Sequence, residues 1–97
     1  MEILGKLGRN EIMALLVIKR KKGICSVSYL FRVIGSTDYA IIYRLLEAGL
    51  IEVRSEIAFY PLRLVWLTEK GKIVAEYLSK IAEIINTQRI EKEKLSS

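Results

Sequence analysis

The sequence predicts a mainly α-helical domain that carries one β-hairpin, an α+β fold. Apolar residues recur at helical spacing in three stretches before residue 50, and the period then falls to near two between residues 50 and 67. A long amphipathic helix is expected over 68–95. At 97 residues the chain is long enough for one hydrophobic core, so we expect a single domain over 1–97, with helices and hairpin in 10–67.

The first helix is expected to begin at Asn10, whose side chain is a good N-cap. Glu11 then lies in the first turn and basic residues lie in the last turn, as the helix dipole favours. Gly23 is expected to end the helix as its C′ residue.

A second, shorter helix is predicted over about 27–34, with Ser26 as its N-cap. Leu30, Val33 and Ile34 are expected to face the core. Gly35 would form the turn that follows.

The third helix is predicted over 36–48, with Ser36 or Thr37 as its N-cap and Gly49 as its stop. Asp38 is expected to complete the cap and to favour the helix dipole. An apolar face is formed by Ile41, Ile42, Leu45 and Leu46.

The hairpin is predicted from alternation after Leu50. Ile51 and Val53 alternate on the first strand, and the second strand presents Leu62, Leu64 and Trp66. Its connection, about 56–61, holds Pro61, which cannot donate to a strand ladder. The tip 57–61 is unusually apolar, and its role is left open, with the partner subunit as one possible contact.

Thr68 is expected to cap the final helix, in which Gly71 is tolerated but adds nothing. The apolar band of this helix is too wide to be buried on one subunit, which predicts a homodimer. The residues assigned to the dimer interface are Val74, Tyr77, Leu78, Ile81, Ile84 and Ile85.

The composition argues against an enzyme. Histidine is absent, only one aspartate is present, and Cys25 is the only cysteine, so neither acid–base catalysis nor a soft metal site has the residues it needs. No glycine motif for binding phosphates occurs. We therefore expect no cofactor and no metal. Cys25 is expected to be buried, with an intersubunit disulfide as the alternative.

Two further expectations concern the cell. The longest apolar run, 12–18, is too short to span a bilayer, and no export signal opens the chain, which predicts a cytoplasmic protein without membrane contact. The scarcity of glutamine and asparagine is typical of proteins from hot environments.

The net charge of +5 favours an anionic partner. The excess lies in residues 1–35, which hold seven basic and two acidic side chains, whereas 36–67 hold three and four.

Two segments together resemble the winged helix-turn-helix family, in particular MarR-like and PadR-like transcription regulators and their small archaeal and archaeal-virus relatives. "STDYAIIYRLLEAGLIEV" is similar to the recognition helix that leads into the wing, and "VWLTEKGKIVAEYL" is similar to the end of the wing. The resemblance covers about 10–85. It implies a DNA-binding regulator that places helix 36–48 in the major groove and is usually a two-fold dimer.

The candidate DNA contacts lie on the side of helix 36–48 away from the core, on the wing and in the basic run before Gly23. Arg44 could pair with guanine, and the wing residues could contact phosphate. The residues assigned to DNA are Ser36, Thr37, Tyr39, Ala40, Tyr43, Arg44, Arg54, Arg63, Lys21 and Lys22.

The alternative to a sequence-specific regulator is a winged-helix module that binds another protein. Its support is the weak charge of residues 36–67, together with the apolar tip of the hairpin. A steep salt dependence of binding would favour double-stranded DNA, and a flat one would favour the protein partner.

Overall fold

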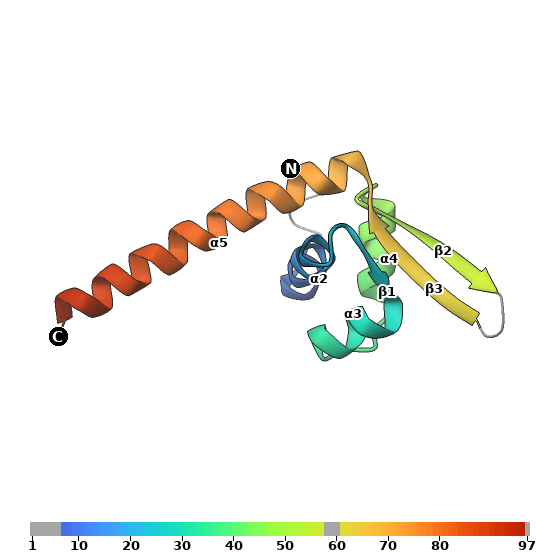
Figure 1. Cartoon of the computed structure of the whole chain (residues 1–97), viewed down its shortest axis with the longest axis horizontal. Coiled ribbons are helices and arrows are strands. Elements are labelled where there is room, and N and C mark those ends of the chain that lie inside the picture. Colours follow the sequence, from blue (N-terminus) through green and yellow to red (C-terminus); the bar gives the residue numbers. More distant parts are fainter. Residues whose placement is uncertain (1–6, 58–60, 97) are drawn as a thin grey trace.

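The predicted α+β architecture is confirmed in the computed structural model, shown in Figure 1. The structure describes the backbone of residues 7–57 and 61–96 and the side chains of residues 7–55 and 63–86. In chain order the elements are α2 (Arg9–Arg20), β1 (Ile24–Ser26), α3 (Val27–Ile34), α4 (Ala40–Glu47), β2 (Ile51–Ile57), β3 (Pro61–Leu67) and α5 (Glu69–Ser96). The predicted apolar tip 57–61 includes residues 58–60 and the side chains of Ile57 and Pro61, which lie outside the described part.

The sheet of the described chain is antiparallel, in the order β1-β3-β2. The hairpin is confirmed, and the short strand β1 was not predicted. Cys25 of β1 pairs with Val65 of β3, about 40 residues further along the chain. Three residues are too few to show an alternating pattern, so only the folded hairpin reveals this strand.

The side-chain register of β3 differs from the prediction. Val65 and Leu67 are buried in the core, whereas Leu64 and Trp66 are half-buried on the outer face of the sheet. All four side chains are apolar, so alternation alone could not choose between the two registers. On the outer face the Trp66 indole N–H donates to a Glu52 carboxylate oxygen at 2.8 Å.

Helix α2 begins earlier than predicted. Gly8 is its N-cap, and Asn10 lies inside the first turn. At the other end, the amide of Gly23 donates to the Ile18 carbonyl at 2.9 Å, and the amide of Lys22 donates to the Lys19 carbonyl at 3.0 Å. Lys22, at φ 62°, therefore takes the C′ position that was assigned to Gly23.

Helix α3 has the predicted cap, since Ser26 Oγ accepts from the Tyr29 amide at 3.1 Å. Its inner face is partly different from the prediction. Leu30 and Phe31 are buried, whereas Val33 is exposed. Phe31 follows Leu30 directly, and this rotates the buried stripe away from Val33.

Helix α4 begins at Ala40 rather than at residue 36. Tyr39 is the N-cap residue and makes no side-chain cap hydrogen bond, while Asp38 completes the cap as expected, because its Oδ1 accepts from the Ala40 amide at 2.9 Å. Ser36 and Thr37 therefore precede the helix and belong to the turn. Ile41, Ile42 and Leu45 are buried as predicted, but Leu46 is exposed.

The start of α5 is fixed against the end of α4. Thr68 caps α5 as predicted, with Oγ1 accepting from the Gly71 amide at 3.0 Å and donating to the Gly49 carbonyl at 2.7 Å. Gly71 is more than tolerated, because a Cβ there would lie 1.9 Å from the Leu50 carbonyl oxygen. The close approach of α5 to Leu50 therefore requires glycine.

The core lies between α2, α3, α4 and the inner face of the sheet. The largest fully buried apolar side chains are Leu15, Ile18, Leu30, Ile41, Leu45, Leu50 and Val65. Cys25 is buried as expected, and burial raises the pKa of its thiol while Lys21 opposes the shift. Helix α5 packs its first turns on this core and then extends well beyond it (Figure 1).

Candidate nucleic-acid interface

The outward flank of α4 is open to solvent. Ile41, Ile42 and Leu45 turn inward, which leaves Tyr43, Arg44 and Glu47 on the other side. Tyr43 is 66% exposed, the largest exposed fraction among the large apolar and aromatic side chains of the described chain. An aromatic side chain kept this open on a short helix is available to a partner.

Arg44 is not a free cation. Its Nη1 lies 2.6 Å from Oε1 of Glu11, a carboxylate of α2 that is only 2% exposed. The hydrogen bond from Arg44 and then its charge interaction with Glu11 raise the Arg44 pKa, so the guanidinium stays charged. The Arg44 side chain remains 53% exposed, so part of it still faces solvent.

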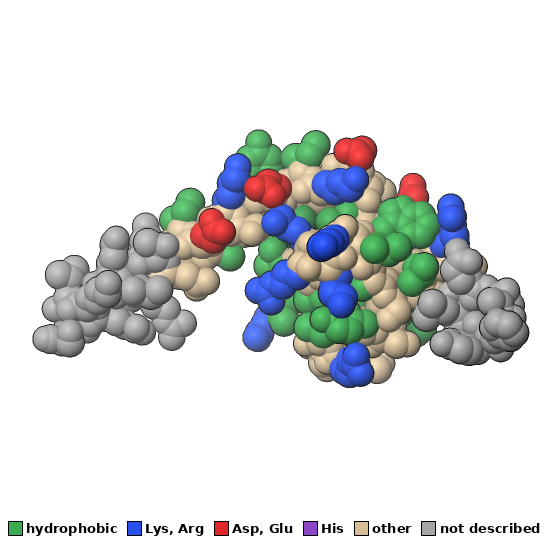
Figure 2. All heavy atoms as spheres, in the orientation of Figure 1, with side chains coloured by type: hydrophobic (Ala, Val, Ile, Leu, Met, Phe, Trp, Pro, Cys, Tyr) green, Lys and Arg blue, Asp and Glu red, His purple; other side chains and the backbone are tan. Residues whose placement is uncertain are grey.

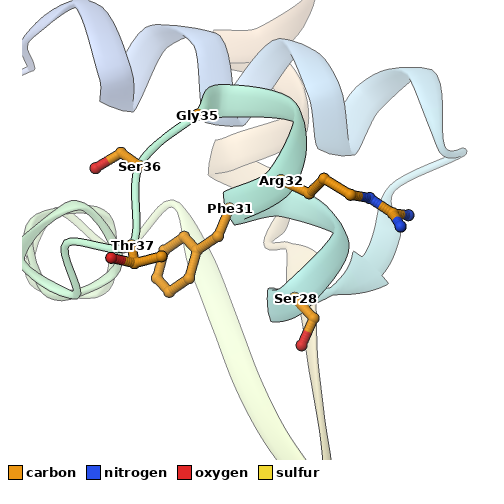
Figure 3. Close-up of a pocket in the computed structure, with 6 residues that line it drawn as sticks. All are labelled: Ser28, Phe31, Arg32, Gly35, Ser36 and Thr37. Atoms are coloured by element: carbon orange, nitrogen blue, oxygen red, sulfur yellow. The ribbon is translucent and has the colours of Figure 1, made fainter.

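An open hollow of about 470 Å³ lies between α3 and the turn that leads into α4 (Figure 3). In Figure 3 the Phe31 ring reaches from α3 toward Thr37, with Ser28 at one end and Ser36 at the other. One aromatic ring, three hydroxyl groups and one arginine thus line the hollow, and in Figure 3 the Arg32 side chain extends away from Ser36 and Thr37. The lining residues are Ser28, Phe31, Arg32, Gly35, Ser36 and Thr37.

Tyr39 connects the turn before α4 to the wing, which is the hairpin of β2 and β3. Its ring meets Phe31 edge-to-face, with centroids 5.1 Å apart, and its hydroxyl accepts from Arg63 Nη1 at 3.3 Å. The Arg63 guanidinium also lies 5.6 Å from the centroid of the Tyr39 ring. The structure therefore brings the predicted residues Tyr39 and Arg63 together, beside the hollow that Phe31 helps to form.

The remaining basic candidates divide into separate locations. Lys21 lies 4.7 Å from the Tyr29 ring centroid, and Arg32 lies 5.6 Å from the same centroid, so both cations share one ring. Arg54 stacks on Trp66 at 4.9 Å, on the outer face of the sheet.

Lys22 lies apart from these residues. It lines a second hollow of about 220 Å³ with Lys19, Gly23, Leu67 and Lys72. Leu67 is the end of β3 opposite the hairpin tip, so Lys22 is at the base of the wing rather than near the turn before α4.

The predicted dimer residues form two groups. Val74 and Leu78 pack against the subunit's own core, whereas Tyr77, Ile81, Ile84 and Ile85 are exposed. Ile73 is also exposed and extends the band toward the start of α5. Figure 2 shows hydrophobic side chains along the outside of α5, and lysine and arginine side chains over the central body.

Sequence reasoning missed Ser28, Arg32 and Glu11. Ser28 and Arg32 are four residues apart on α3, and this spacing on a helix was the available signal that they share a face. No local pattern connects Glu11 with Arg44, because 33 residues separate them. Their pairing depends on the packing of α2 against α4.

No helix of the described residues is both long and apolar enough to cross a bilayer. Within that same part of the chain, no group of three or more histidine, cysteine, aspartate or glutamate residues could hold a metal ion.

A short helix with an open flank, preceded by a turn and a helix and followed by a hairpin, defines the winged helix-turn-helix class. Comparison with known proteins supports this assignment. No protein-family model and no curated protein sequence matches the chain. Solved structures do match it.

Two matches come from archaea. Sso10a-2, a DNA-binding protein from Sulfolobus solfataricus, is 21% identical with a TM-score of 0.65, and the alignment covers 92% of this chain and 93% of that one. A transcriptional regulator homologue from Pyrococcus horikoshii OT3 is also 21% identical at a TM-score of 0.65, with coverage of 91% and 98%.

A third match is BpsR from Bordetella bronchiseptica, whose DNA binding is regulated by 6-hydroxynicotinic acid. It is 27% identical with a TM-score of 0.66, over 87% of this chain and 65% of that chain. The protein is thus structurally similar to winged-helix DNA-binding transcription regulators from archaea and bacteria, and these matches are non-enzymatic.

Proposed function

We propose that this protein is a sequence-specific transcription regulator that binds double-stranded DNA as a homodimer. The observation that carries the proposal is the open flank of α4, where Tyr43 and part of Arg44 remain exposed while the opposite side of the helix closes the core. The similarity to Sso10a-2 and BpsR, both described as binding DNA, supports the same reading. The flank of α4 and the turn before it enter the major groove, which is wide enough for a helix.

Residues around the hollow hold the DNA backbone. Ser28, Ser36 and Thr37 offer hydroxyl groups, and Arg32 offers a charged donor, which are the groups that contact phosphate oxygens. Arg63 acts beside them from the wing, where Tyr39 fixes its guanidinium. These contacts orient α4 without reading sequence.

We assign contacts with base edges to Tyr43, Ala40 and the solvent-facing part of Arg44. Arginine donates well to the O6 and N7 atoms of guanine, and Ala40 can approach a thymine methyl group. Lys21, over the Tyr29 ring, and Arg54, on the outer face of the sheet, add positive charge outside this surface. Lys22, at the base of the wing, adds to the general attraction for DNA rather than to a specific contact.

The exposed part of the α5 band forms the dimer interface. Tyr77, Ile81, Ile84 and Ile85 are open in the single chain, and burying them against a second copy removes a large apolar surface from water. A two-fold axis through α5 presents two α4 helices to successive major grooves, about 34 Å apart. The target is then a palindromic site. A DNA-binding role is consistent with the expected cytoplasmic location.

Selection of bound fragments from random duplex DNA, followed by salt titration of the selected site, tests this function. We expect one enriched palindromic sequence, and an affinity that falls linearly on a log–log plot against salt. Each phosphate neutralised contributes a slope of about −0.9. Failure to enrich any sequence would contradict specific binding.

A winged-helix protein-binding module is the second candidate. The specific observation in its favour is the pairing of Arg44 with Glu11, which leaves the flank of α4 with little net positive charge, beside an exposed Tyr43 and Leu46. Such a surface would bind a protein through apolar contacts. In that case the affinity for DNA would be weak, and partner binding would be nearly independent of salt.

A further inference from the structure

Glu11 is buried in the contact between α2 and α4, although it carries a charge. Its exposed fraction is the lowest of any charged side chain described, and its Oε1 accepts from Arg44 Nη1 at 2.6 Å. A buried carboxylate without a partner would be costly, so the fold holds the Arg44 side chain to Glu11. Glu11, the residue that orients the Arg44 side chain, therefore lies on a different helix from Arg44.

The surroundings of Glu11 are fitted to this arrangement. Gly8, the N-cap of α2, lies next to the carboxylate, and a Cβ at that position would stand 3.0 Å from Glu11 Oε2. Glycine thus leaves space for the carboxylate beside the start of α2. Gly8 has φ −82°, so its backbone does not itself require glycine.

We propose that Glu11 is a positioning residue for DNA recognition, which fixes Arg44 in one orientation on α4 and withholds part of its charge from non-specific phosphates. This inference rests on the proposed DNA-binding function. It assigns a specificity role to a residue that does not touch DNA.

Two physical consequences lead to specificity. A side chain already held in one geometry loses little rotamer freedom when DNA binds, so the favourable contact with the correct base is retained. The carboxylate also reduces the attraction of Arg44 for any backbone phosphate, and this attraction is the main source of non-specific binding. Both effects increase the difference in binding affinity between the selected site and other DNA.

The test compares Glu11→Gln with Glu76→Gln. Glu76 of α5 pairs with Lys19 at 3.5 Å on the surface, so both variants remove one carboxylate charge and one ion pair. The change in net charge is therefore equal in the two proteins. Any additional change in Glu11→Gln comes from the release of Arg44.

Binding is measured by fluorescence anisotropy, with the selected duplex and a scrambled duplex of equal length, over a range of salt. Relative to Glu76→Gln, we expect Glu11→Gln to lower the ratio of specific to non-specific affinity about tenfold, the size of one lost arginine–base contact. We also expect its non-specific salt slope to steepen by about 0.9, for one added phosphate contact.

Gly8→Ala provides a second variant that keeps both charges. The new methyl group would stand 3.0 Å from Glu11 Oε2 and would make the carboxylate shift slightly, so a smaller fall in the same ratio is expected, with an unchanged net charge. Circular dichroism checks that each variant is folded, and Gly8→Ala decides the result if Glu11→Gln is unfolded.

Two outcomes would overturn the role of Glu11. The first is an equal affinity ratio in Glu11→Gln and Glu76→Gln. The second, if Glu11→Gln is unfolded, is an unchanged affinity ratio in a folded Gly8→Ala. If the wild-type protein fails to bind duplex DNA at all, the proposed function itself falls.

Discussion

At the scale of single residues, Arg44 contributes both to the stability of the fold and to the proposed DNA contact. Its guanidinium neutralises the buried Glu11 carboxylate, and its exposed part lies on the flank of α4 proposed to meet DNA. Removing Arg44 therefore changes folding as well as recognition. Loss of DNA binding in an Arg44 variant is evidence for a contact only if the variant is shown to remain folded.

Arg44→Ala is expected to destabilise the fold, because it leaves the buried Glu11 carboxylate without its partner. We expect the midpoint of urea unfolding, followed by circular dichroism, to fall by roughly 1 M. The double variant Arg44→Ala with Glu11→Gln should recover part of this loss, since a neutral amide costs less to bury than a carboxylate. An unchanged midpoint in Arg44→Ala would show that the ion pair adds nothing to stability.

At the scale of the elements, the start of α5 decides how the final helix leaves the domain. Thr68 binds the Gly49 carbonyl and caps α5 at the same time, while the Thr68 amide donates to the Leu50 carbonyl at 3.1 Å. The backbone of Leu50 thus lies directly against the first turn of α5. Gly49, at φ 74°, ends α4 in the left-handed conformation that makes this reversal.

Gly71→Ala is expected to disrupt this junction, because its Cβ would overlap the Leu50 carbonyl oxygen. Backbone atoms on both sides leave little room to adjust, so we expect a loss of about 3 kcal/mol in the free energy of unfolding. Thermal denaturation should show a fall of more than about 10 °C for a chain of this size. Lys72→Ala, on the exposed side of the same turn, should change the melting temperature little; equal melting temperatures for the two variants would refute the close approach.

Elements with local signals were predictable from the sequence. Ser26 and Thr68 cap helices because a hydroxyl group three residues before an amide is a local arrangement. The hairpin was predictable from the two-residue period of its apolar side chains. By contrast, Gly71 reads as a poor helix residue until Leu50 is placed against it, and β1 becomes a strand only when β3 pairs with it.

The candidate site was predictable only in outline. The outer flank of α4 follows from its helical period, and Tyr43 is exposed as that period requires. The sequence could not show that Tyr39 binds Arg63 or that Arg44 binds Glu11. Each of these contacts joins elements whose relative positions are set by the core.

At the scale of the whole molecule, the described apolar side chains of α5 divide between the core and an exposed band. Val74 and Leu78 attach α5 to its own subunit, while Tyr77, Ile81, Ile84 and Ile85 face outward. A helix that extends beyond the body with such a band has no reason to stay ordered alone in water. In the proposed homodimer, a second copy of the chain covers this band and sets the distance between the two α4 helices.

Ile81→Glu tests this arrangement, since it places a charge in the middle of the exposed band, where Ile81 is 53% exposed in the single chain. Sedimentation velocity should show a dimer for the wild-type protein and a monomer for Ile81→Glu. Asn86→Glu is the matched control, because it adds the same charge to α5 but lies on the other side of the helix by the 3.6-residue period. The control should remain dimeric.

The Ile81→Glu monomer should then bind one half-site of the palindrome, with a salt slope about half that of the dimer, because only half of the phosphates are contacted. A dimer that persists in Ile81→Glu would place the interface elsewhere and would remove the basis for the two-fold spacing of α4.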